Sequence, residues 1–320
     1  MKKNMINRYL KKILKYLFKD KLNQILDKKN IIVVFRNGSA IGDHLYMSSV
    51  LREIALKGYK IILFSNYYEL FLNNIRIKKI YKIGSKNIFW SFLNIFKGKN
   101  ILEFRSKHEE TKGKHFLFFH KDKKIHLSKA NSEHFNLNLK YEKLDNEFFF
   151  SDNELKDWNK NIDLPFRYSL IQSTTKKNYT KNKEWDFNGM QMIVNHFKKI
   201  NWIQIGKLDE PKLKNCSHLL NLNLRKLAYI IYKSEFLVTY EGLFNHLAAC
   251  FNKKNFIIHT GFLPVEAFNY KNNILIENNK EYPCYPCYDI NCKHHPYFTK
   301  KNIKIEKVIK KIEDNISHYK

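Results

Sequence analysis

Residues 31–54 constrain the fold more than any other stretch of this chain. An apolar run of strand length, Ile31–Phe35, is followed by a turn with two glycines, Gly38 and Gly42, and then by Asp43. Apolar residues at helical spacing come next, along one stripe. A strand, a glycine turn and a helix in this order build ligand sites in α/β domains. They do so because backbone N–H groups and the helix N-terminus meet beside the carboxyl end of the strand.

Asp43 has two interpretations at this position. It can serve as a base that faces a cleft, or it can be an acid in the first turn of a helix, where the helix dipole favours a carboxylate. The second arrangement is the commoner one, so this stretch alone does not identify a catalytic acid.

Strand-length apolar runs alternate with helical segments from Ile31 to about residue 104, and the alternation restarts at Tyr168. This predicts two α/β halves, each with parallel strands joined by crossover helices. Between them the pattern weakens, and Pro165 stands among turn-forming residues, as in a linker. The expected divisions are a basic amphipathic helix (1–30), a first α/β domain (31–150), a linker (151–166), a second α/β domain (167–300) and a C-terminal helix that packs back (301–320).

Periodicity also places the individual elements. Besides the helix that follows the glycine turn, the first half is expected to contain five strands, the last with its exit loop, and two further helices: strands 31–35, 59–65, 79–83, 101–104 and 115–127, and helices 67–75 and 89–96. The second half is expected to contain five strands and four helices: strands 168–172, 202–206, 236–239, 256–259 and 274–277, and helices 187–199, 224–232, 243–251 and 305–316.

The chain carries a formal net charge of +28, from 58 Lys and Arg against 30 Asp and Glu. This charge would fit a nucleic acid, an anionic membrane surface or a phosphate-bearing substrate. The basic residues are mostly lysines spread along the whole chain, and Asn and Ile are also abundant, which indicates the compositional bias of an AT-rich genome. Because clustered arginine and a recognition motif are both missing from the sequence, we expect no specific nucleic-acid partner.

Five cysteines in 320 residues favour a reducing compartment over a disulfide framework. No run of 18 apolar residues predicts a membrane span, and the N-terminus lacks the apolar region of a signal peptide. We therefore expect a cytoplasmic protein. Residues 5–27 form a basic amphipathic pattern, which would either lie on the inner face of the cytoplasmic membrane as a peripheral anchor or pack against its own domain.

A polar loop follows the first strand of the second half. It begins with three hydroxyls, Ser173, Thr174 and Thr175, and contains four lysines, of which Lys183 is the last. Hydroxyl and ammonium donors between a strand and a helix suit a diphosphate group. The alternative is a solvated surface loop of a lysine-rich protein.

Glu241, Gly242 and His246 stand at the end of a later strand and the start of the following helix. Their spacing spans one to two helical turns, so the acid and the imidazole can face the same cleft. The alternatives are an acid that only caps the helix and a histidine that belongs to the core.

Cys284, Cys287 and Cys292 form a C-x2-C-x4-C pattern, and His294 follows closely. Three thiolates and an imidazole are a ligand set for tetrahedral zinc or for iron. The alternative is a reduced, cysteine-rich loop packed on the sheet.

Taken together, these segments resemble glycosyltransferase family 9, the bacterial heptosyltransferase family of lipopolysaccharide synthesis. NGSAIGDHLYMSSVLREI is similar to its opening G-x-x-G-D motif, with the spacing from Gly38 loosened and Gly42 and Asp43 intact. STTKKNYTKNKEW is similar to its donor-phosphate loop, with Lys183 in the characteristic place. TYEGLFNHLAAC and CYPCYDINC are similar to its donor segment and its Cys-bearing tail. The likeness covers residues 31–298.

The resemblance implies a GT-B fold, in which two Rossmann-like domains face each other across a cleft and the second holds most of the nucleotide sugar. It implies inverting transfer with no cofactor required for catalysis, and Asp43 would be the general base that deprotonates the acceptor hydroxyl. Asp43 and Lys183 would face the same crevice, and Glu210 would bind the ribose. The implied donor-binding residues are Ser173, Thr174, Thr175, Lys183, Glu210, Glu241, Gly242 and His246.

The sequence therefore predicts a glycosyltransferase that moves heptose or a related sugar from a nucleotide-diphosphate sugar to a lipid-linked or surface glycan, such as a lipopolysaccharide or lipooligosaccharide core. The family's Asp-Ser/Thr-Gly triplet is replaced here by Glu241, Gly242 and Leu243, which leaves the donor sugar open. The Cys-His tail is similar to that of metal-bearing autotransporter heptosyltransferases. The alternatives are thus a protein O-heptosyltransferase with a structural zinc or iron, and a non-catalytic nucleotide-sugar binder of the same fold.

Overall fold

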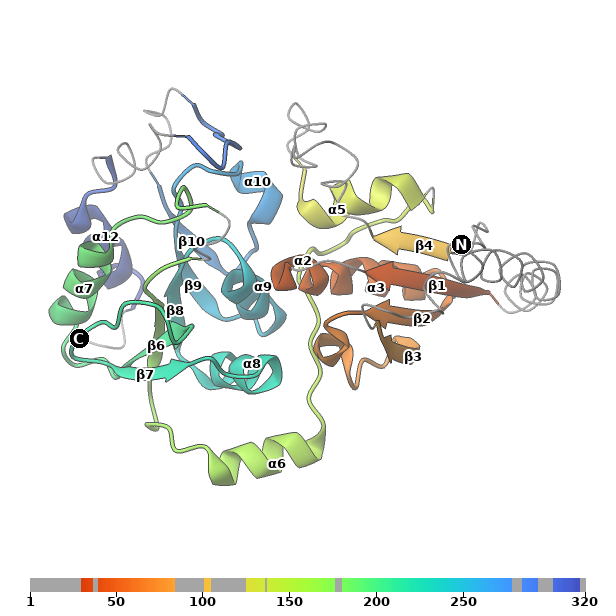
Figure 1. Ribbon diagram of the computed structural model, residues 1–320, viewed down its shortest axis with the longest axis horizontal. Coiled ribbons are helices and arrows are strands. Elements are labelled where there is room, and N and C mark those ends of the chain that lie inside the picture. Colours follow the sequence, from red (N-terminus) through yellow and green to blue (C-terminus); the bar gives the residue numbers. More distant parts are fainter. Residues whose placement is uncertain are drawn as a thin grey trace, which may run out of the picture. The chain divides into compact units, whose positions relative to one another are not determined.

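The structure is a computed structural model that describes residues 30–36, 40–83, 101–104, 125–135, 137–175, 180–277, 284–292 and 302–316. The chain divides into two compact units, each with its own parallel sheet (Figure 1). The first unit comprises residues up to Phe116 together with Ser128–Lys143, and the second comprises Leu117–Leu127 and Leu144–Lys320. The predicted basic N-terminal helix, the helix 89–96 and most of segment 115–127 lie outside the described residues.

The first unit is built on four parallel strands in the order β3-β2-β1-β4. The strands are β1 (Ile31–Arg36), β2 (Lys60–Ser65), β3 (Ile77–Lys82) and β4 (Ile101–Phe104). They agree with the predicted ones to within two residues. The chain reverses between β1 and β2 through the helices α2 (Ile41–Leu45) and α3 (Met47–Leu56). The predicted apolar stripe of α3 is fully buried, as expected for a crossover helix: Met47, Val50, Leu51 and Ile54.

Hydrogen bonds made by two serine hydroxyls connect α5 (Leu127–Ser132) to the start of α3. Ser49 Oγ donates to Ser128 Oγ at 2.9 Å, and Ser128 Oγ donates in turn to the carbonyl of Tyr46. All these side chains are buried, so the small serines let the backbones approach closely while their polar atoms stay paired.

The prediction of a helix at 67–75 is wrong. The structure has a single 3-10 turn, η1 (Tyr68–Phe71), followed by a backbone reversal. Asn73 adopts a positive φ of 62°, and Asn74 Oδ1 accepts from the backbone N–H of Arg76 at 2.9 Å. Asparagine competes with helical hydrogen bonding through such local side-chain contacts, and this ends the helix after one turn.

The second unit holds a sheet of six parallel strands in the order β10-β9-β8-β5-β6-β7. Counted from its first strand, this is the order 3-2-1-4-5-6 of a Rossmann fold, and the first unit follows the beginning of the same order. The strands are β5 (Ser169–Gln172), β6 (Trp202–Gly206), β7 (Ser217–Leu220), β8 (Phe236–Thr239), β9 (Lys254–Ile258) and β10 (Asn273–Ile276).

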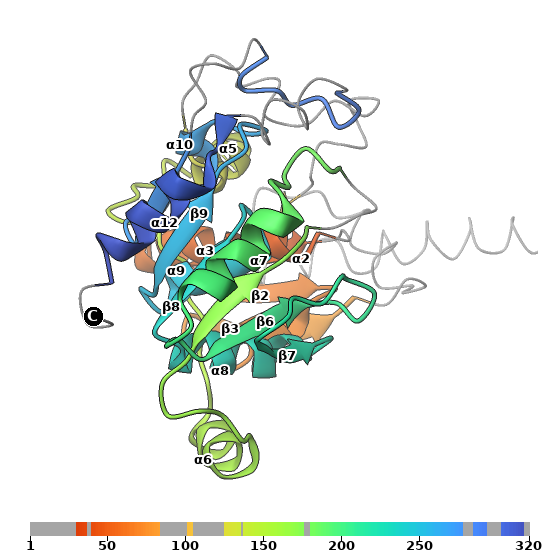
Figure 2. The same ribbon diagram turned by 90° about the vertical axis from the view of Figure 1, so that its left-hand side faces the viewer.

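Helices cover both faces of this sheet, which explains why its inner strands are buried along nearly their whole length. The helices are α7 (Phe187–His196), α8 (Leu224–Lys233), α9 (Leu243–Cys250), α10 (Val265–Phe268) and α12 (Ile305–Glu313). Figure 2 shows α7 and α12 side by side on one face, where they share a core with inward side chains of the strands. The predicted C-terminal helix is therefore present, and it packs against α7 and β10.

Three elements of this unit were not predicted. One is α10, whose four residues are too few to show an apolar stripe at helical spacing. β7 is a short edge strand whose side chains are mostly exposed, so it gives no apolar alternation. In the predicted linker, residues 152–161 form the helix α6 (Asp152–Asn161), which begins with a capping box between Ser151 and Glu154. Because α6 is mostly polar, it has no apolar stripe from which a helix could be predicted, although the Ser-x-x-Glu signature of a capping box is present in the sequence.

None of the helices in the described ranges is long and apolar enough to span a membrane.

An ion pair ties α6 to α8. Arg225 donates to both carboxylate oxygens of Glu154, at 2.5 and 2.7 Å, and also to the carbonyl of Phe149 at 2.7 Å. Its guanidinium lies 4.8 Å from the centre of the Phe148 ring. The hydrogen bonds from Arg225 are the main reason that the pKa of Glu154 is lowered.

Replacing Arg225 with Met is expected to lower the free energy of unfolding by about 2–3 kcal/mol at neutral pH, since it removes the guanidinium that pairs with Glu154 and donates to the carbonyl of Phe149. Because the pKa of Glu154 is lowered in the folded state, its contribution is present above the unfolded pKa and lost as pH falls. The difference between wild type and variant should therefore shrink below about pH 4.

Urea denaturation of wild type and Arg225→Met, at neutral pH and below about pH 4, measures the difference in unfolding free energy. The matched control is Arg167→Met, which removes an exposed bidentate pair with Glu235 and should cost less than about 1 kcal/mol. Equal losses in the two variants would contradict the account.

Candidate functional site

The strand order of the second unit defines where a ligand site is expected. β5 and β8 are neighbours in the sheet, and the chain proceeds from them toward opposite edges. In open parallel sheets, ligands bind at the carboxyl ends of the strands at such a switch point, because the two following loops separate there. The loop after β5 contains Ser173 to Lys183, and the turn after β8 contains Glu241 and Gly242. Both predicted donor segments thus start at this edge.

An ion pair joins these two segments. Lys183 Nζ lies 2.9 Å from Glu241 Oε1, and the ammonium also lies 5.0 Å from the centre of the Phe262 ring. The Glu241 side chain is only 3% exposed, whereas that of Lys183 is 19% exposed. Neither Glu241 oxygen accepts a well-aligned hydrogen bond from the residues that the structure describes, so Lys183 is its charge partner there. This ion pair places the Lys183 ammonium at the switch point.

Gly242 lies between β8 and α9 and has backbone angles that other residues rarely adopt, with φ 144° and ψ −151°. A Cβ built on it would meet nothing within 4 Å, so the requirement for glycine comes from the backbone and not from crowding. In the described part of the chain, no side chain caps the first turn of α9. Its N-terminal N–H groups and positive dipole end therefore remain available to an anion.

The three hydroxyls after β5 have different surroundings. Ser173 Oγ accepts from Gln204 Nε2 at 2.8 Å, inside the fold. Thr175 gives both its backbone N–H and its hydroxyl to one oxygen of Glu184, at 2.8 and 3.1 Å. Thr174 Oγ1 is buried without a well-aligned partner among the described residues. Of the three, only Thr174 has a hydroxyl not already engaged in closing the loop.

Glu210 lies against the end of β6, the strand next to β5. Its carboxylate packs over Gly206, where a Cβ would come within 2.2 Å of Glu210 Oε2. Burial raises the pKa of Glu210, and the backbone of Lys207 and the hydroxyl of Thr174 offset only part of this rise. Oε2 makes no well-aligned hydrogen bond within the described ranges. An acid at the end of the second Rossmann strand is in the place where a ribose hydroxyl is bound in that fold.

His246 lies on α9 and is 4% exposed. Its Nδ1 is 2.7 Å from the Tyr270 hydroxyl, which also accepts from Asn146 Nδ2 at 2.9 Å. Burial lowers the pKa of His246 to about 3, and the charges of His126 and Lys183 add to this effect. The imidazole is therefore neutral at physiological pH, and its packing against Tyr270 fits the alternative of a core histidine.

Asp43 belongs to the first unit and lies in the first turn of the five-residue helix α2. The guanidinium of Arg36, at the end of β1, donates to Asp43 Oδ2 at 3.1 Å. Arg36 is buried, but the Asp43 side chain remains 37% exposed. The carboxylate is thus held from the protein side while it stays open to solvent. Gly42 precedes it in the same turn, and Gly38 lies outside the described residues.

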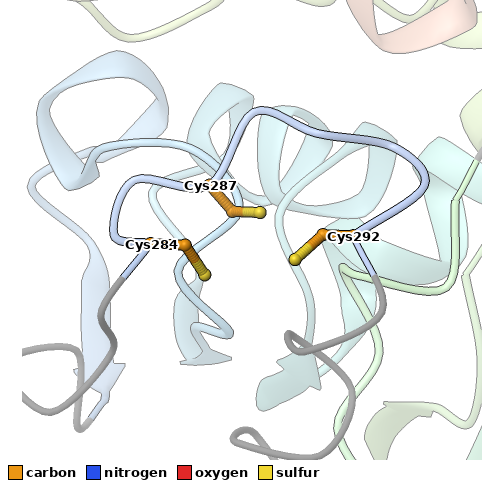
Figure 3. Close-up of side chains that lie close together, drawn as sticks. All are labelled: Cys284, Cys287 and Cys292. Carbon is orange, nitrogen blue, oxygen red and sulfur yellow. The ribbon is translucent and has the colours of Figure 1, made fainter.

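The three cysteines of segment 284–292 form a cluster. Their Sγ atoms all lie within 4.8 Å of one another, and Figure 3 shows the side chains turned toward a common space. Burial raises the pKa of the Cys287 thiol to about 12 and also raises that of Cys284. Cys292 adds to both shifts, whereas a hydrogen bond with Cys287 offsets part of the rise at Cys284. Three sulfurs that repel one another as thiolates but converge on one point fit a thiophilic cation. His294 lies outside the described residues.

Sequence reasoning missed several residues that shape these sites: Arg36, Gln172, Glu184 and Phe262. Gln172, the last residue of β5, donates to the carbonyl of Thr174 and accepts from the backbone N–H of Tyr240, so it links the two loops. Glu184 follows the predicted Lys183 directly in the sequence. The sequence shows that Glu184 adjoins the loop predicted to bind a diphosphate. Only the tertiary structure shows that its carboxylate closes this loop by accepting from Thr175.

No protein-family model matches the sequence, and no curated protein sequence matches it either. Solved structures do match. A glycosyl transferase of family 9 from Veillonella parvula is 13% identical, with 90% of this chain and 97% of that chain covered and a TM-score of 0.62. The ADP-heptose LPS heptosyltransferase II of E. coli is 10% identical, with 90% and 99% covered and a TM-score of 0.64.

The iron-containing dodecameric glycosyltransferase TibC of enterotoxigenic E. coli is 11% identical, with 91% of this chain and 76% of that chain covered and a TM-score of 0.64. At such low identities the likeness establishes the fold. The chain has the GT-B fold seen in glycosyltransferases of family 9 and in heptosyltransferases, which confirms at the level of the fold the resemblance predicted from the motifs.

Replacing Lys183 with Met is expected to destabilise the protein by roughly 3 kcal/mol, because Glu241 would remain buried without its charge partner. The double variant Lys183→Met with Glu241→Gln should lose less than the sum of the two single variants. Chemical denaturation gives these values. The matched control is Lys181→Met, an exposed lysine of the same loop, which should change stability by less than about 0.5 kcal/mol. If Lys183→Met behaves like Lys181→Met, the ion pair contributes nothing.

Proposed function

We propose that this protein is an inverting glycosyltransferase that transfers heptose or a related sugar from a nucleotide-diphosphate sugar to a cell-surface glycan, such as a lipopolysaccharide or lipooligosaccharide core. The observation that carries this proposal is the meeting of Lys183, Glu241 and the uncapped start of α9 at the switch point of a GT-B unit. A cation beside free helix N–H groups is a site for a diphosphate. Matching structures include an E. coli heptosyltransferase with ADP bound.

In the donor site, the diphosphate oxygens accept from the first N–H groups of α9 and from Lys183, with the Thr174 hydroxyl as a further donor. Glu241 keeps Lys183 at the switch point until the more highly charged diphosphate competes for its ammonium. Glu210 binds a ribose hydroxyl with the oxygen that has no well-aligned partner in the described structure. As the sugar leaves, negative charge builds up on the diphosphate, and the same donors stabilise it.

Asp43 is the general base of the proposed reaction. Its carboxylate takes the proton of the acceptor hydroxyl, the acceptor oxygen attacks the anomeric carbon, and the bond from that carbon to the diphosphate breaks on the opposite face. The donor from Arg36 fixes one carboxylate oxygen and leaves the group open to solvent, where an acceptor could reach it. The configuration at the anomeric carbon is inverted because the attack is a single in-line displacement.

A panel of nucleotide sugars tests this function, with release of nucleoside diphosphate as the readout and donor-induced thermal stabilisation in parallel. The Asp43→Asn variant should lose at least about a hundredfold in turnover, since general-base catalysis contributes roughly this much. Its donor binding should be kept. The matched control is Asp209→Asn, an exposed acid in the described structure, which should leave both properties unchanged. Unchanged turnover in Asp43→Asn would refute the base assignment, and binding without turnover in wild type would indicate a non-catalytic binder.

We further propose that Cys284, Cys287 and Cys292 hold a structural zinc or iron ion, with His294 as the fourth ligand. The convergence of the three sulfurs supports this, as does the iron-containing TibC among the matching structures. A bound cation would cross-link the segment and offset the repulsion between thiolates. This cluster is also what favours a protein acceptor, in the manner of a protein O-heptosyltransferase, as the second candidate function.

Elemental analysis of anaerobically purified protein should find about one zinc or iron per chain. Replacing Cys284 and Cys287 by Ser should abolish the bound metal, whereas Cys216→Ser, which changes a cysteine outside the cluster, should retain it. Metal-free wild type would leave only the packing role of the loop.

A further inference from the structure

The segment that carries the three cysteines is hydrogen-bonded to the loop that carries Lys183. Asn182 Nδ2 donates to the carbonyl of Asp289 at 2.6 Å, and Thr180 Oγ1 donates to the carbonyl of Ile290 at 2.9 Å. Both acceptors are main-chain oxygens between the second and third cysteines. Their positions therefore depend on whether those cysteines are held together.

The same segment also supports the loop that follows β9. The backbone N–H groups of Cys287 and Tyr288 donate to the carbonyls of Gly261 and Phe262, each at 3.0 Å. Phe262 is the residue whose ring lies beside the Lys183 ammonium. The cysteine segment is therefore connected to Lys183 in two ways. One is through Thr180 and Asn182, which precede Lys183 in the chain, and the other is through the Phe262 ring, against which the Lys183 ammonium lies.

Asn182 is the residue at which these contacts meet. It is 3% exposed and directly precedes Lys183. Its backbone N–H donates to Thr180 Oγ1 at 3.0 Å, its carbonyl accepts from Thr260 Oγ1 at 2.8 Å, and its side-chain amide holds Asp289. The position of Lys183 is thus set by a buried network that spans the β5 loop, the end of β9 and the cysteine segment.

We propose that Asn182 is a positioning residue that couples the cysteine cluster to the donor site, so that metal binding at the cysteines strengthens binding of a nucleoside diphosphate. This inference rests on the proposed donor site. With the cysteines joined, the carbonyls of residues 289 and 290 are fixed and Lys183 is already in place. With the cysteines apart, the loop must be ordered at the moment of binding, and this cost lowers affinity.

The test measures binding of ADP and of UDP to the full-length protein by calorimetry, first loaded with Zn²⁺ and then stripped by a chelator. Wild type should bind at least one of the two nucleotides about tenfold more tightly when loaded, a coupling of ordinary size for linked sites. In Asn182→Ala, the loaded protein should bind as weakly as stripped wild type, and stripping should change little. Thr180→Val, which removes only one hydroxyl, should reduce the coupling partially.

The matched control is Lys181→Ala, an exposed residue between the two that make the contacts. Loss of its charge can weaken nucleotide binding, but the ratio between loaded and stripped protein should stay that of wild type. Because coupling is reciprocal, the nucleotide should tighten Zn²⁺ binding by the same factor in wild type and in Lys181→Ala, and not in Asn182→Ala. Competition with a chromogenic chelator measures this.

Equal nucleotide affinity of loaded and stripped wild type would overturn the inference while leaving the proposed function standing. Wild-type coupling in Asn182→Ala would overturn the role of Asn182. If circular dichroism shows that Asn182→Ala does not fold, Thr180→Val decides: unchanged coupling in that variant overturns the proposal. Absence of any ADP or UDP binding would instead refute the proposed donor site, and absence of bound Zn²⁺ would refute the metal cluster.

Discussion

The buried ion pair between Lys183 and Glu241 is the interaction on which the second unit's candidate site depends. A carboxylate that is 3% exposed is stable only with a cation beside it, since a buried charge without a partner is costly. The two residues follow different strands, β5 and β8, which are neighbours at the switch point of the sheet. One electrostatic requirement therefore closes the turn after β8, fixes the loop after β5, and places an ammonium group near the open start of α9.

Around this pair, each neighbouring strand end contributes one chemical feature. The end of β6 contributes Glu210, packed against Gly206. The loop after β9 contributes Phe262, and the cysteine segment lies against that loop through two backbone hydrogen bonds. Parallel strands concentrate such features because all their carboxyl ends meet at one edge of the sheet. The GT-B architecture explains why residues separated by a hundred positions contribute to one site, and the polar contacts explain how each is oriented.

The predicted strands that fall within the described residues were correct within a few residues, because buried parallel strands are continuous apolar runs that can be recognised without knowledge of their neighbours. The errors have physical causes too. β7 is an exposed edge strand, α6 is almost entirely polar, and the segment after β2 has helix-like spacing that Asn73 and Asn74 interrupt. In each case, local turn chemistry or the sheet's own geometry decided the outcome, and neither is visible in apolar periodicity.

The sequence by itself determined the two α/β halves, the parallel strands and the list of polar residues able to do chemistry, because these follow from apolar spacing and from residue type. Only the tertiary structure decided how those residues are used. It paired Lys183 with Glu241, engaged Thr175 with Glu184, buried His246 as a neutral imidazole and brought the cysteine segment against the donor loop through Asn182. The physical reason is that hydrogen bonds, ion pairs and burial depend on distances between residues remote in sequence, and the fold alone sets those distances.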